Sequence, residues 1–211
     1  QIKKHPHPMK AKAIGLFVGV LVSTLIAATA NASDPDGQFA IKGAGVASCE
    51  RFVTARKEQS PEYFLFGGWI EGFISAMNNY EPNTFDVLPW QSIDIFAAAL
   101  SQVCEKQPEM PFYKAVGGLA QSFGKTRVSE FSKRLILGDE SGVRSPIYEV
   151  VLKRVQAKLK EDGHYTSTVD GKFGPGTSGA IRKYQEANSL PVTGIPDQRT
   201  LVRMFINETQ P

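Results

Sequence analysis

The sequence predicts an all-α protein with two helical domains, the first of four helices stapled by a disulfide and the second of three helices. Apolar residues recur every three or four positions, the spacing of one helical face, in both halves of the 211-residue chain. Serine and proline start signals stand where helices of the first half should begin. The chain has two cysteines, Cys49 and Cys104, and they bracket three of those helices.

Residues 1–32 have the three-part pattern of a secretory signal peptide. Two lysines precede an apolar run at 13–28, and Ala-Asn-Ala at 30–32 is a cleavage site. The alternative is an uncleaved membrane anchor, but the run is shorter than the ~20 residues that a spanning helix needs. We therefore expect a mature chain from Ser33 that meets a membrane only during export. Residues 1–8 are interpreted as an upstream extension.

Export changes the meaning of the net charge of +3. Four of the 24 basic side chains and none of the 21 acidic ones lie in residues 1–32, which leaves a net charge of −1 beyond them. A chain with this balance has no bulk charge for nucleic acid. Nucleic-acid binding is therefore not expected.

The first domain is predicted at 44–123. Helices are expected at 49–56, 61–79, 89–104 and 111–123, each with an apolar face. The second of these is apolar on most sides, which is typical of a helix at the centre of a domain. Its small residues Gly68, Gly72 and Ala76 recur every four positions and predict a flat stripe on which another helix lies.

A disulfide between Cys49 and Cys104 follows from the expected export, because oxidising compartments favour pairing. The alternative is a pair of buried free thiols. Neither cysteine belongs to a CxxC pair or to a ligand cluster, so no metal site is predicted. The bridge should matter because the core of a domain of about 80 residues is marginal by size alone.

Residues 124–146 have the composition of a linker, rich in glycine, serine and charge. Phe131 and the apolar run 135–137 interrupt it. These residues are expected to form a short strand or to pack on one of the domains.

The second domain is predicted at 147–207. Its first helix has apolar residues every four positions from Ile147 to Leu159, and Gly163 should end it. Two further apolar faces follow, and Asp197 is the expected N-cap of the last helix. Between the first two helices lies a glycine-rich loop at 170–177, whose Thr177 is expected to cap the second helix.

This region resembles the peptidoglycan-binding-like domain of cell-wall hydrolases. The resemblance spans about 148–206 and implies a three-helix bundle that holds the stem peptide or glycan of the bacterial wall without cutting it. It rests on an ordered series of residues: Val155-Gln156-x-x-Leu159, Gly163-x-Tyr165, Asp170-Gly171-x-Phe173-Gly174, Thr177-x-x-Ala180-Ile181, Tyr184-Gln185, Leu190, Thr193-Gly194, Asp197 and Thr200-Leu201.

Candidate peptidoglycan-binding residues lie in the loop and on the helix after it. They are Asp170, Gly171, Phe173, Gly174, Thr177, Arg182, Tyr184 and Gln185. The loop residues have an alternative role in shaping the loop itself. Arg182 and Gln185 are expected to be exposed, where they could meet a carboxylate or amide of a stem peptide. His164 is interpreted as a solvated loop residue.

The first domain has a weaker resemblance to two families. Cys49-Glu50-x-Phe52, Gly68-Trp69-x-x-Gly72-Phe73 and Cys104-x-x-x-Pro108 are similar to periplasmic acid-stress chaperones of the HdeA/HdeB type. Gly68-Trp69-Ile70-Glu71-Gly72 is similar to immunity proteins of the Rap1a/Tai type. These resemblances imply a protein client or a toxin as a partner.

The sequence argues against catalysis. Beyond residue 7 there is one histidine, both cysteines should be bridged, and four short helices offer little cleft for a sugar chain. Counting acids does not exclude a carboxylate pair. We therefore expect a secreted or periplasmic non-catalytic envelope protein, without cofactor or metal, that binds peptidoglycan and presents its first domain to a protein. The alternatives are a chaperone or immunity protein, and a cell-wall hydrolase.

Overall fold

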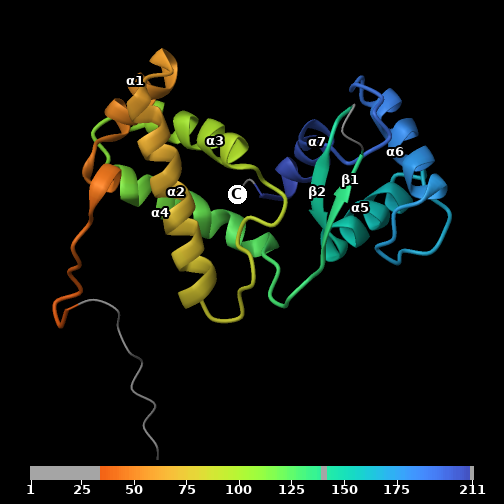
Figure 1. The fold of residues 1–211 in the computed structure, drawn as a ribbon, viewed down its shortest axis with the longest axis horizontal. Helices are drawn as coiled ribbons and strands as arrows, with labels where there is room; N and C mark the ends of the chain where they lie inside the picture. The colour runs from red at the N-terminus through yellow and green to blue at the C-terminus, as the bar shows by residue number, and fades with distance from the viewer. Residues whose placement is uncertain (1–33, 139–141, 210–211) are drawn as a thin grey trace, which may run out of the picture. The chain divides into compact units, whose positions relative to one another are not determined.

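The computed structural model describes residues 34–138 and 142–209 (Figure 1). The predicted signal peptide, its alternative as an anchor and the upstream extension lie outside these residues. The described part contains seven α-helices and one two-stranded sheet, so the predicted helical fold class is confirmed. None of its helices is both long enough and apolar enough to cross a membrane.

The first half contains the four predicted helices: α1 (Cys49–Glu58), α2 (Pro61–Tyr80), α3 (Ile93–Lys106) and α4 (Phe112–Phe123). Short 3-10 turns, η1 (Gly43–Val46) and η2 (Gly124–Thr126), flank them. The hydroxyls of Ser48 and Ser92 cap α1 and α3 by accepting bonds from backbone N–H groups. Helix α3 begins four residues later than predicted, because the chain around Trp90 packs into another core.

An aromatic cluster fills the core between these helices. The rings of Phe52, Phe66 and Phe112 lie 4.7–5.4 Å apart and are fully buried. Beside them Cys49 and Cys104 form the predicted disulfide, with their Cα atoms 4.8 Å apart. The bridge ties the start of α1 to the end of α3.

Helix α2 differs from the prediction of a central helix. It buries one stripe, Phe66, Ile70 and Ile74, and leaves Phe64 and Leu65 exposed. The expected helix-packing stripe is also wrong. Gly68 and Gly72 are exposed and have no neighbour within 4 Å of a hypothetical Cβ. One apolar stripe is enough to seat α2 on the aromatic cluster, so its other apolar residues stay at the surface.

A β-hairpin begins in the stretch predicted as a linker, 124–146, and ends two residues beyond it. Strands β1 (Arg134–Leu137) and β2 (Ser145–Tyr148) pair antiparallel, with Arg134 opposite Tyr148 and Leu137 opposite Ser145. Leu137, Ser145 and Ile147 are buried, which places one face of the hairpin against the second core. The apolar run 135–137 thus forms the strand that was one of its two expected outcomes.

The second core lies among α5 (Glu149–Glu161), α6 (Pro175–Ala187) and α7 (Gln198–Thr209). These helices agree with the three predicted from apolar spacing, except that Ile147 belongs to β2 and α5 begins at Glu149. Gly163 follows α5 with φ +77° as expected. Trp90, from the loop between α2 and α3, is buried in this core with its ring 5.7 Å from that of Phe205. The Gln198 side chain donates to the Trp90 carbonyl at 2.7 Å and accepts from the Ser92 N–H at 3.0 Å.

Candidate functional site

A buried glutamine holds the glycine-rich loop after α5. The Gln156 side chain is fully buried, and its Oε1 accepts from the N–H groups of Asp170 and Gly171 at 2.9 and 2.8 Å. Its Nε2 donates toward the Lys172 carbonyl at 3.0 Å and the Thr177 hydroxyl at 3.1 Å. One side chain on α5 therefore fixes both the loop and the first turn of α6.

A second buried glutamine repeats this arrangement one helix later. The Gln185 Oε1 accepts from the Gly194 N–H at 2.8 Å. Its Nε2 donates to the Ile195 carbonyl at 3.0 Å and to the Thr200 hydroxyl at 2.9 Å. Asp197 caps the last helix as predicted, because its Oδ1 accepts from the Thr200 N–H at 2.9 Å. We call these two side chains the glutamine clamps.

The glutamine clamps change the interpretation of several motif residues. Gln185 was expected to be exposed, but its exposed fraction is 0%, because its amide is fully used inside the loop. Thr177 does not cap α6, since that helix begins at Pro175 and the Thr177 hydroxyl bonds to Gln156 and the Lys172 carbonyl. These two candidates are buried in the framework of the loops.

The other candidates differ in burial. Arg182 is exposed, Phe173 and Gly174 are half-buried, and Gly171 and Tyr184 are buried, although Tyr184 lines a cavity. Asp170 is exposed in its loop. The Lys172 N–H, then the Gln156 side chain, hold the pKa of the Asp170 carboxyl below its ordinary value by hydrogen bonding to the ionised form. These hydrogen bonds therefore favour the ionised form of Asp170.

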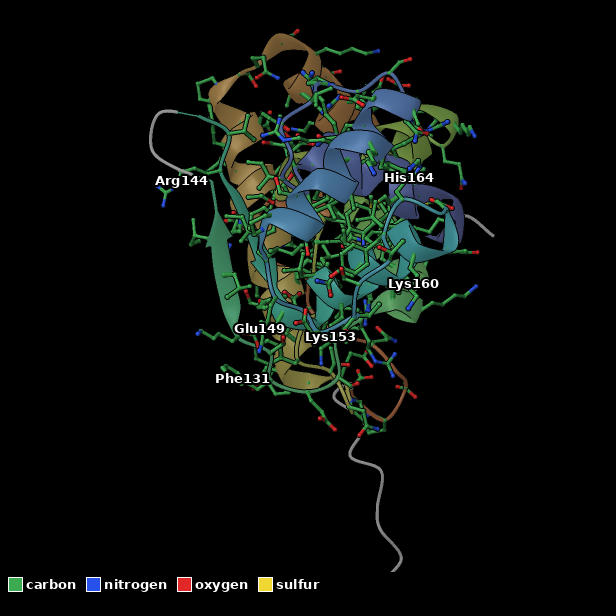
Figure 2. The ribbon with its side chains drawn as sticks, turned by 90° about the vertical axis from the view of Figure 1, so that its right-hand side faces the viewer. Phe131, Arg144, Glu149, Lys153, Lys160 and His164 are labelled. Carbon is green, nitrogen blue, oxygen red and sulfur yellow. A yellow bond between two sulfur atoms is a disulfide. The ribbon has the colours of Figure 1, made fainter. Side chains whose placement is uncertain are left out.

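A polar cavity of about 400 Å³ opens where α5, α6 and α7 converge. Its lining residues are Lys158, Asp162, His164, Tyr184, Asn188, Arg203 and Met204. Figure 2 labels Lys160, near the end of α5, and His164, in the loop just beyond that helix. His164 is half-buried with its ring 6.0 Å from that of Tyr184, so it is less solvated than expected.

The cavity holds fixed cations. The Lys158 Nζ lies 3.1 Å from the Asp162 Oδ1 and 3.1 Å from the Glu161 Oε2. Both hydrogen bonds raise the pKa of the Lys158 ammonium, and the bond to Asp162 has the larger effect. Arg203 donates to the Asn188 side chain at 2.9 Å. Sequence reasoning did not single out Lys158, Asn188 or Arg203, because each is an ordinary polar residue on a helix or directly after one. Only the folded bundle brings them together.

A second hollow bears on the argument against catalysis. A cavity of about 330 Å³ lies where the loop between α2 and α3 meets the hairpin and the start of α7. The expectation of little cleft considered four helices alone, and this hollow forms only where they meet the other elements. Among the described residues there is no group of three or more metal-ligating side chains, and both cysteines are bridged.

Residues 151–204 match the family described as putative peptidoglycan binding domain. The predicted peptidoglycan-binding-like domain is thereby supported, with peptidoglycan as its partner. Such a match indicates an extracytoplasmic or cell-wall location. The resemblance of the first half to acid-stress chaperones or immunity proteins has no support from these comparisons, nor does the expected client or toxin.

Two curated relatives, both from Bacillus cereus and one of them from strain ATCC 14579, are named spore cortex-lytic enzyme. Each is 38% identical to this chain over 92 residues, which is 44% of this chain and 32% of the relative. The chain thus spans about a third of the length of the curated relatives it matches. No solved structure matches.

These relatives contradict the prediction of a non-catalytic protein. Both relatives are named for a lytic activity, and their similarity to this chain covers the binding region. The sequence argument counted histidines and cysteines along the whole chain, but it judged the available cleft from the four-helix domain alone. Of the functions considered, the cell-wall hydrolase is the one that the comparisons favour.

Proposed function

We propose that the chain is a cell-wall hydrolase whose C-terminal module binds peptidoglycan, in the periplasm or outside the cell. The observation that carries the proposal is the 38% identity to spore cortex-lytic enzymes over a stretch of 92 residues. The family match at 151–204 supports wall binding by the module itself. Peptidoglycan lies outside the cytoplasmic membrane, which agrees with the export signal expected from the sequence.

The polar cavity is the wall-binding site that the geometry favours. Stem peptides carry carboxylates and amides, and the cavity offers both the Lys158 ammonium and the Arg203 guanidinium. The Tyr184 hydroxyl stays protonated at neutral pH, because burial and then Asp162 raise its pKa. Cations paired with neutral donors are suited to the end of a peptide. Arg182 and Asp170 are not among the residues that line this cavity.

Sedimentation with purified sacculi tests the binding. We expect the chain to pellet with sacculi, and Arg203→Gln to weaken binding about tenfold, the loss of one charge-assisted hydrogen bond. Lys160→Gln is the matched control, since Lys160 is an exposed cation on α5 that does not line the cavity. Recovery no better than that of an unrelated domain would overturn the proposal of wall binding.

Release of soluble fragments from the same sacculi tests the hydrolysis. New reducing ends would indicate glycan cleavage, and new amines would indicate peptide cleavage. Glu71→Gln and Asp86→Asn are the first variants to compare, because these two carboxylates line one hollow of about 390 Å³. Intact sacculi after incubation with the chain, at a concentration that saturates binding, would refute the hydrolase.

A further inference from the structure

The hollow beside the hairpin is built from three separate parts of the chain. It has a volume of about 330 Å³, within the range of small-molecule sites. The loop between α2 and α3, both strands of the hairpin and the first residue of α7 contribute to it. Its lining includes Asp86, Trp90, Gln91, Arg134, Tyr148 and Gln198.

Gln91 lines this hollow and also the hollow of about 390 Å³, and it carries an unused hydrogen-bond donor. The residue is 93% buried, and its Oε1 accepts from the Trp90 N–H at 3.3 Å. Its Nε2, in contrast, is buried without a hydrogen-bond partner in the described part of the chain. A buried donor left unpaired costs about 1–3 kcal/mol, so a ligand with a carbonyl or hydroxyl acceptor would recover that loss.

A carboxylate and a phenol lie in the same wall. The Tyr148 hydroxyl donates to the Asp86 Oδ2 at 3.1 Å, and the Asp86 Oδ1 accepts from the Leu88 N–H at 3.0 Å. Burial, then the charge of Asp86, raise the pKa of Tyr148, so the phenol remains a donor at neutral pH. Asp86 is thus held in place, with oxygen lone pairs that can accept a ligand hydroxyl.

Arg134 adds a cation at the rim. It stands opposite Tyr148 in the hairpin and is exposed, so its guanidinium is free to turn toward a ligand in the hollow. The rest of the wall is fixed. Gln198 bonds to the backbone of both Trp90 and Ser92, so little ordering remains to be done when a ligand enters.

We propose that this hollow binds an N-acylated sugar of the wall glycan whose carboxylate is free, as it is where no stem peptide is attached. The acyl carbonyl accepts from the Gln91 Nε2, a sugar hydroxyl donates to Asp86, and the carboxylate pairs with Arg134. An apolar ligand would leave the Gln91 Nε2 unpaired. This inference rests on the proposed function and adds a second contact with the substrate, outside the module at 151–204.

A titration of the full chain with the disaccharide of N-acetylglucosamine and N-acetylmuramic acid tests the site. We expect saturable NMR shifts of the Gln91 side-chain amide and the Trp90 indole. Arg134→Gln should lower the affinity for this disaccharide at least tenfold but leave the affinity for chitobiose, which has no carboxylate, nearly unchanged. Gln91→Leu should lower the affinity for both sugars. Arg144→Gln is the control, because Arg144 is an exposed arginine of the same hairpin region that does not line the hollow (Figure 2).

The outcomes separate this inference from the proposed function. Absence of shifts at Gln91 and Trp90 at millimolar disaccharide overturns the sugar site, even if sacculi are still bound and cleaved. Equal effects of Arg134→Gln and Arg144→Gln on the disaccharide also overturn it. If the disaccharide binds as described while sacculi remain intact, the sugar site stands and the hydrolase proposal fails. Arg134 is exposed, so its variant should fold even if Gln91→Leu does not.

Discussion

Replacing Gln156 with leucine should remove the support of the glycine-rich loop while keeping the volume of the side chain. Two backbone N–H groups lose their acceptor, and that of Gly171 is buried. A buried orphan donor costs about 1–3 kcal/mol, and the partly buried second one adds a smaller amount. We therefore expect Gln156→Leu to lower the free energy of unfolding of the second core by about 2–4 kcal/mol.

The two tryptophans allow this loss to be measured where it occurs. Trp90 belongs to the second core, whereas Trp69 packs against the first. In a Trp69→Phe background, Trp90 fluorescence during urea unfolding reports the second core alone, and linear extrapolation gives the free energy. The matched control is Gln102→Leu on the exposed face of α3, with an expected change within ±0.5 kcal/mol. A loss below about 1 kcal/mol for Gln156→Leu would refute the role of the clamp.

Three further predictions follow from the same structure. Replacing Cys49 and Cys104 together by serine should destabilise the first core by about 4 kcal/mol, which is the chain-entropy value for a separation of 55 residues. The thermal midpoint of unfolding measures this loss, and reduction of the unmodified chain is the cross-check. Because the pKa of Asp170 is lowered in the folded state, its ionised form stabilises the fold at pH values above the ordinary pKa of 3.8, and this stability is lost as the pH falls through the folded-state pKa. Asp170→Asn should therefore flatten the acid side of a plot of urea midpoint against pH. An unchanged acid side would contradict this. Gly171→Ala should lower the free energy of unfolding by at least about 1 kcal/mol, because φ is +77° and the new Cβ would lie 2.8 Å from the Glu149 carbonyl oxygen. Gly179→Ala, inside α6, should instead raise the free energy of unfolding by about 0.5–1 kcal/mol.

Local pattern was sufficient for most of the helices. Apolar spacing located α5, α6 and α7, and the compartment argument located the bridge of Cys49 and Cys104, because both depend on residue type and nearest neighbours. Helix α2 shows the limit of that reasoning. Its sequence is apolar on most sides, yet burial depends on how many partners surround a helix, which the helix's own sequence does not state.

The candidate site was predicted only in outline. The loop stood out because of its glycines, of which Gly171 has a positive φ; Gly194, in the later loop held by Gln185, also has one. Gln156 and Gln185 had no comparable signal, since a glutamine on a helix is ordinarily exposed. Their burial follows from loops that fold back over them, and the hollow beside the hairpin likewise needs residues more than a hundred positions apart, such as Trp90 and Gln198.

The insertion of Trp90 into the second core has a consequence for how the protein can be divided. A fragment cut anywhere between α4 and α5 would carry all three wall-module helices and still lack the ring that lies against Phe205. Such a fragment would have a cavity in its core, and the Gln198 amide would lack its backbone partners at Trp90 and Ser92. The core of the three C-terminal helices is thus completed by a residue from the loop between α2 and α3, and fusing these helices to another protein would require that loop as well.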